Sequence, residues 1–236
     1  MDFTPRPCHF DNTPHLLKMK IKANWLTRKP HPDAHYVTAA LTLLLWALAF
    51  LSFSGVPWMK ASGELVFGAH EYGRLWLSLF AHGDFGHLAA NTFLFVPLTY
   101  VLSAYFGPFL LPLFGILIGG LINAIVIATM PQNIFLVGIS GVVSWMAATW
   151  ITLYLLIDRR DPLKRRFGAV LFLTLIWFVP ETLKPEVSYL SHFVGYVLGV
   201  LSGWLYYLMH RRTFAAAVVL EEPEPDFIPE EDWQQS

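Results

Sequence analysis

Four residues whose types suit chemistry lie within long apolar stretches of this sequence: His87, Asn91, Ser140 and His192. Ionisable side chains inside a membrane are costly and usually functional. A serine hydroxyl becomes nucleophilic when a base lies within hydrogen-bonding reach, so Ser140 and His192 form a candidate pair if their helices face one another. His87 and Asn91 are one helical turn apart and project from the same helix face.

Each feature also has a plainer interpretation when it is taken alone. The run Gly138-Ile-Ser-Gly141 resembles the small-residue clusters that are common in membrane helices. A histidine such as His192 can be a core residue bonded to a carbonyl. His87 and Asn91 can form a hydrogen-bonded pair between helices. The coincidence of all these features at one depth of the membrane favours a functional site.

The composition indicates lipid as the solvent. Of the 236 residues, 55% are hydrophobic and only 14% are charged, whereas soluble domains carry about 25% charged residues. The net charge is −1, and Lys and Arg form short clusters between apolar blocks, which argues against a nucleic-acid partner. Cys8 is the single cysteine, so the chain has no intrachain disulfide.

The hydropathy pattern predicts an all-α polytopic membrane protein with six transmembrane helices. A span needs about 20 apolar residues, and the fifth candidate is short, although Lys164, Arg165 and Arg166 could extend it by snorkelling. The predicted spans are Tyr36–Ser54, Phe85–Phe106, Pro108–Met130, Phe135–Ile157, Gly168–Glu181 and Val187–Met209.

The basic residues set the predicted orientation. Thirteen of the sixteen Lys and Arg residues precede the first span, separate the fourth from the fifth, or follow the sixth. By the positive-inside rule, both termini are then cytoplasmic. Every even-numbered span starts on the outer side, so His87, Ser140 and His192 share one outer depth. The absence of a signal or transit peptide pattern and the basic N-terminus favour a bacterial inner membrane, with a eukaryotic secretory membrane as the other option.

Small residues predict that the fourth and sixth spans pack closely. Gly195, Gly199 and Gly203 form a small-xxx-small stripe on the sixth span, and Gly141 lies beside Ser140 on the fourth. Such stripes allow membrane helices to approach at short backbone distance. A serine side chain on one helix could then reach an imidazole on the other.

Three regions follow from these patterns. Residues 1–34 are a cytoplasmic N-terminal segment, residues 35–210 form the six-helix domain, and residues 211–236 form an acidic cytoplasmic tail that we expect to be disordered. The aromatic-rich segment Gly55–Ala81 is expected to lie partly in the outer leaflet.

Taken together, the motifs resemble those of the rhomboid intramembrane serine proteases, bacterial type, with a six-helix core. The resemblance covers roughly residues 36–209. The motifs that carry it are His82-Gly-Asp-Phe-Gly-His87-Leu-Ala-Ala-Asn91, Gly138-Ile-Ser140-Gly141 and His192-Phe-Val-Gly195-Tyr-Val-Leu-Gly199.

The resemblance implies a serine endopeptidase that cleaves transmembrane helices of substrate proteins near their outer ends. Ser140 would be the nucleophile and His192 its general base, without an aspartate. The backbone N–H of Ser140 and the side chains of His87 and Asn91 would form the oxyanion hole. No metal or cofactor is implied.

The resemblance also suggests a lateral gate for substrate helices at Trp177 and Phe178, near the outer end of the short fifth span. Two positions depart from the family pattern: Gly73-Arg74 stands where many members have Trp-Arg, and Ser144 stands where many have a tyrosine against the base.

Three other functions remain as alternatives. The first is a catalytically inactive relative that binds transmembrane helices for quality control. The second is a channel or transporter, which would typically show internal repeats or charged residues at mid-membrane. The third is a membrane acyl hydrolase that uses the same dyad on lipid.

Overall fold

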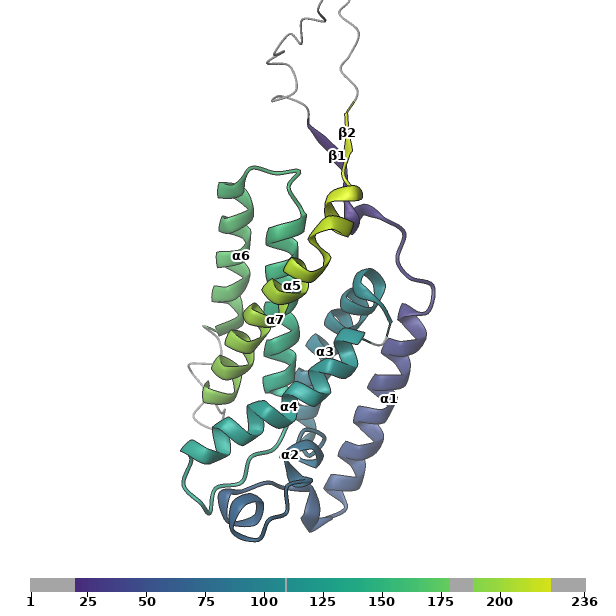
Figure 1. Cartoon of the computed structure of the whole chain (residues 1–236). Helices are drawn as coiled ribbons and strands as arrows, with labels where there is room; N and C mark the ends of the chain where they lie inside the picture. Colours follow the sequence, from purple (N-terminus) through teal and green to yellow (C-terminus); the bar gives the residue numbers. More distant parts are fainter. Residues whose placement is uncertain (1–19, 109, 179–188, 222–236) are drawn as a thin grey trace, which may run out of the picture.

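The computed structural model describes residues 20–108, 110–178 and 189–221, and these residues form a bundle of long helices (Figure 1). The long helices are α1 (Ala34–Phe53), α3 (Phe85–Phe106), α4 (Leu110–Thr129), α5 (Ser140–Ile157), α6 (Leu163–Phe178) and α7 (Tyr189–Ala216). The short elements are β1 (Ile21–Ala23), η2 (Trp25–Thr27), η3 (Pro57–Met59), η4 (Glu64–Gly68), α2 (Arg74–Leu77) and β2 (Val219–Leu220). The all-α fold predicted from hydropathy is therefore confirmed.

Five of these helices are long and apolar enough to cross a membrane: α1, α3, α5, α7 and the Pro112–Thr129 part of α4. The described part of α6 has 16 residues; the residues after Phe178 lie outside the described ones, so the length of the fifth span stays a prediction. Helix α6 begins at Leu163 rather than at the predicted Gly168, so the basic residues before the apolar run lie in its first turn.

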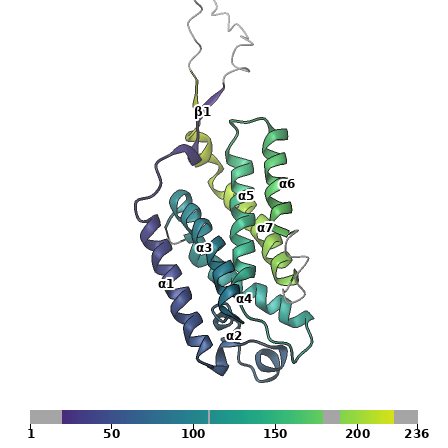
Figure 2. The ribbon, with the colours of Figure 1, turned by 180° about the vertical axis from the view of Figure 1, so that it is seen from behind.

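Helix α5 lies at the centre of the bundle and contacts α3, α4, α6 and α7 (Figures 1 and 2). Of an 18-residue apolar stretch in each helix, 67% is buried within the protein in α5, against 28% in α1 and 22% in α7. The other helices therefore shield most of α5 from lipid.

Two further predicted boundaries were wrong by five residues or more. The fourth span was expected to start at Phe135, but the helix begins at Ser140, because Leu136 pairs in an extended bridge with Ala61 and Gly138 adopts a positive φ of 105°. The sixth span was expected to end at Met209, but α7 continues to Ala216.

The segments that flank the helices pack together at one end of the bundle. Strand β1 pairs antiparallel with β2, and Trp25 stacks edge-on against Phe214 with ring centroids 5.4 Å apart. We call residues 20–28 and 213–221 the terminal clasp. The predicted region boundaries at residues 34 and 210 stay predictions, and the tail beyond residue 221 lies outside the described residues.

Candidate active site

The turn before α5 fixes where Ser140 enters the helix. Gly138 has a left-handed φ of 105°, which glycine adopts without steric cost. Its N–H donates to the carbonyl of Ser78 at 2.9 Å, so the turn is tied to the loop after α2. Ser140 is then the first residue of α5 and is partly exposed. Its backbone N–H has no acceptor within the helix, as is general for a first turn.

His87 and Asn91 lie against this turn. A Cβ on Gly138 would come within 2.9 Å of His87 Cε1 and 3.7 Å of Asn91 Nδ2. The first turn of α3 is held by Asp84, whose side chain accepts the N–H of His87 at 2.8 Å. The structure thus brings the two predicted side chains on α3 to the turn that carries Ser140, and glycine at position 138 leaves them the space.

Helices α5 and α7 approach each other at the predicted glycines. A Cβ on Gly195 would overlap the carbonyl of Gly141, and a Cβ on Gly199 would come within 2.7 Å of Ala148 Cβ. A Cβ on Gly203 would come within 2.9 Å of the carbonyl oxygen of Thr149. The prediction of close packing along the small-residue stripe is confirmed.

The same contact brings the neighbours of Ser140 and His192 together. A Cβ on Gly141 would lie 2.6 Å from Ser191 Oγ, so the residue after Ser140 lies against the residue before His192. His192 is buried, with 4% of its surface exposed. Ser140 and His192 therefore each adjoin a direct contact between α5 and α7.

His82 belongs to the site, although the sequence analysis gave it no role. It lies in the loop before α3, where its Nδ1 is 3.0 Å from the carbonyl of Phe80 and its Nε2 is 3.1 Å from Asn91 Nδ2. Burial lowers the pKa of His82 to about 4, so the ring is neutral at physiological pH. Nδ1 then donates to Phe80 and Nε2 accepts from Asn91, which fixes the orientation of the amide. In the sequence, the feature that could have indicated this role is the position of His82 five residues before His87.

Two aromatic side chains of α5 and α7 form hydrogen bonds with neighbouring helices. Trp145 donates its indole N–H to Ser202 Oγ on α7 at 3.0 Å. The hydroxyl of Tyr196 lies 2.7 Å from Thr174 Oγ1 on α6. Ser144, at the position where many rhomboid proteases have a tyrosine, is fully buried. The structure describes the helix backbone at Trp177 and Phe178, predicted as a gate, but not their side chains, so the gate stays a prediction.

Arg74 anchors the loop that precedes the site. Its guanidinium donates to the carbonyls of Pro57 at 2.8 Å and Lys60 at 3.0 Å, and it forms an ion pair with Glu71. The loop between α1 and α3 is therefore internally cross-linked, and Ser78 within it supports the turn at Gly138.

The fold and the site define an integral multi-pass membrane protein with a polar centre where α3, α5 and α7 begin. The rhomboid domain family model matches residues 69–209 of the chain, a range that contains all of these site residues. The protein belongs to the rhomboid family. No individual curated protein gives a significant match.

Proposed function

We propose that the protein is an intramembrane serine endopeptidase with Ser140 as nucleophile and His192 as general base. The observation that carries the proposal is the backbone contact of Gly141 with Gly195, beside Ser191. This contact joins the first turn of α5, which carries Ser140, to the first turns of α7, which carry His192, and so supports their assignment as a pair. Membership of the rhomboid family, whose members generally cleave peptide bonds in membranes, supports the same reaction.

In the proposed reaction, neutral His192 accepts the proton of the Ser140 hydroxyl while the serine oxygen attacks the scissile carbonyl carbon. The carbonyl oxygen becomes an oxyanion. His192 then gives its proton to the leaving amine as the C–N bond breaks, and an acyl group remains on Ser140. His192 next deprotonates a water molecule that attacks this ester and restores the serine.

The oxyanion would receive hydrogen bonds from three groups: the Ser140 N–H, the His87 ring and the Asn91 amide. Preorganised donors of this kind often supply a large share of catalysis, and the loss of one typically costs about 10²–10³ in rate. Their shared position against Gly138 supports the assignment. The hydrogen bond between His82 and Asn91 holds one donor in place before substrate arrives.

The substrate class that fits this site is the transmembrane helix of another protein, cleaved near its outer end. Glycines 83 and 86 are exposed at the start of α3, which leaves room for water. We place the enzyme in a bacterial inner membrane with both termini cytoplasmic and the site toward the periplasm. Trp177 and Phe178 remain the proposed gate.

Labelling of the purified protein with a fluorophosphonate probe tests the proposal. The wild type should react, and Ser140→Ala and His192→Ala should each abolish labelling. Ser191→Ala and Ser144→Ala are matched controls, because they remove buried hydroxyls from the same helix pair and should keep labelling.

Two outcomes would count against the proposal. Labelling that survives Ser140→Ala and disappears in Ser191→Ala would move the nucleophile to α7. Absence of labelling in folded wild type, in detergent and in bilayers, would favour the inactive relative that binds transmembrane helices.

A further inference from the structure

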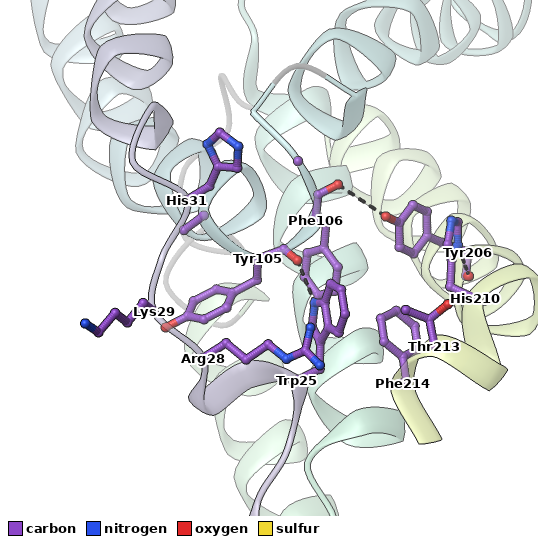
Figure 3. Close-up of a pocket in the computed structure, with 12 residues that line it drawn as sticks. Trp25, Arg28, Lys29, His31, Tyr105, Phe106, Tyr206, His210, Thr213 and Phe214 are labelled. Atoms are coloured by element: carbon purple, nitrogen blue, oxygen red, sulfur yellow. Dashed lines mark hydrogen bonds between the residues drawn. The ribbon is translucent and has the colours of Figure 1, made fainter. Parts of the chain in front are cut away.

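We propose that a cavity at the clasp end of the bundle binds the phosphate group of an anionic phospholipid. The cavity has a volume of about 370 Å³ and lies between the segment before α1, the end of α3 and the last turns of α7 (Figure 3). It lies at the opposite end of α3 and α7 from the candidate active site, and it has no part in the proposed reaction.

Two cations at this cavity provide the charge. Arg28 lies over the Trp25 ring, with its Cζ 4.3 Å from the ring centroid, and Lys29 follows it at the rim (Figure 3). The Trp25 indole donates to the carbonyl of Tyr105 at 2.6 Å, so the ring that supports Arg28 is itself fixed. A guanidinium held in this way loses little freedom when it binds a phosphate.

The positive charge is not neutralised within the described part of the chain. None of the residues that line the cavity is acidic, and no described carboxylate forms an ion pair with Arg28 or Lys29. By contrast, the nearby cations Arg160 and Arg165 are paired with Asp158 and Asp161. Arg28 and Lys29 therefore have no carboxylate partner among the described residues, and an anion at the membrane surface is the partner that we propose for them.

The end of α3 would repel an anion if its carbonyls were free, because a helix C-terminus carries partial negative charge. Three donors cover these carbonyls. The His31 N–H donates to Ala104 at 2.9 Å, the Trp25 indole donates to Tyr105, and the Tyr206 hydroxyl donates to Phe106 at 3.2 Å. The charge at the cavity is then set by Arg28 and Lys29.

The position favours a lipid as the source of the phosphate. The cavity opens where α3 and α7, two candidate membrane spans, end, which is the level of the headgroups. Its walls are largely aromatic, including Tyr105, Tyr206 and Phe214, and tyrosine and tryptophan are enriched at that level. Basic pockets between membrane helices on the positive side commonly bind anionic headgroups.

Thermal unfolding of the full chain in mixed micelles tests the proposal. The probes are phosphatidylglycerol, phosphatidylcholine and inorganic phosphate at matched ionic strength. Phosphatidylglycerol should raise the melting temperature of wild type, while the other two should leave it unchanged. Arg28→Gln with Lys29→Gln should raise the half-saturating fraction of phosphatidylglycerol by roughly 10- to 30-fold, since each basic side chain near an anionic surface is worth about a factor of five.

The matched control is Arg211→Gln with Arg212→Gln, another adjacent pair of exposed cations at the same end of the bundle that do not line the cavity. This control should keep the wild-type response. Equal weakening in both pairs would reduce the effect to general surface charge and overturn the site. An equal response to inorganic phosphate would overturn the lipid as the source. An equal response to phosphatidylcholine would show that the anionic charge is not what the cavity recognises.

Discussion

The two ends of the helical bundle are held together in different ways. At the site end, where α3, α5 and α7 begin, the close contacts are made at Gly138, Gly141 and Gly195. A Cβ at any of these would meet a neighbouring side-chain or backbone atom at 3.0 Å or less. At the clasp end, bulky rings fill the space: Trp25, Phe106, Tyr206 and Phe214 contact one another with centroids 5.4–6.4 Å apart.

The difference fits the function that we propose for the site end. A serine side chain is short, so it reaches a base on another helix only if the two backbones are close, and glycine allows that approach. The clasp end joins chain segments that are far apart in sequence, and large rings bury more surface per residue. We therefore expect small changes at the site end to affect activity, and changes at the clasp end to affect mainly stability.

The largest effect is expected from Gly138→Ala. A Cβ would collide with the His87 ring at 2.9 Å in a backbone conformation with positive φ, so the ring must move. If His87 is an oxyanion donor, activity should fall by about 10²–10³, measured as the rate of fluorophosphonate labelling. Gly55→Ala is the control, because Gly55 also has a positive φ but a Cβ there has no neighbour within 4 Å. Equal losses in both variants would assign the effect to backbone strain alone.

Gly195→Ala should separate α5 from α7. Its Cβ would overlap the Gly141 carbonyl, which is backbone and cannot rotate away. Overpacking typically costs about 1–3 kcal/mol, so the free energy of unfolding in detergent and the labelling rate should both fall. Gly168→Ala on α6 serves as the control, since nothing lies within 4 Å of a Cβ there. A Gly195→Ala protein as stable and active as wild type would show that the helix contact is not needed.

Lowering the pH should reduce the contributions of the two ends to the free energy of unfolding in different pH ranges. Burial lowers the pKa of His82 to about 4 from 6.5, so between these values the unfolded chain binds a proton that the folded chain does not, and stability falls as the pH is lowered. Hydrogen bonds from Arg160 lower the pKa of Asp158 from 3.8, so its contribution is lost only below about pH 4.

The melting temperature as a function of pH measures this separation. His82→Gln retains an acceptor for Asn91 but does not titrate, so its profile between pH 6.5 and 4 should be flatter than that of wild type. An unchanged slope would exclude His82 as the titrating group.

Two buried asparagines, one at each end of the bundle, allow the two ends to be compared directly, with the smallest expected effects. Asn24 donates to Asp158 at 2.8 Å at the clasp end. Asn123 donates to Leu75 at 2.9 Å and Ser78 at 3.1 Å at the site end, and Ser78 holds Gly138. Each change to Ala should lower the free energy of unfolding by about 1–3 kcal/mol. Only Asn123→Ala should also slow labelling. A loss of activity in Asn24→Ala would show that the two ends are coupled.

The sequence by itself determined the helical membrane fold, the close packing of the fourth and sixth spans, and the set of polar residues proposed for the site. These features depend on hydropathy and residue spacing, which act locally along the chain, so α3 was predicted to the residue at Phe85–Phe106. The roles of Ser140 and His192 stay predictions until activity is measured.

Only the tertiary structure decided the details that depend on distant partners. Helix α5 starts at Ser140 because Leu136 pairs with Ala61, and Asn91 is oriented by His82 across a loop. Asn24 bonds with Asp158 across 134 residues of sequence. Local sequence patterns do not indicate which distant segment will form a hydrogen bond with a given backbone or buried polar group, because the packing of the whole bundle determines those partners.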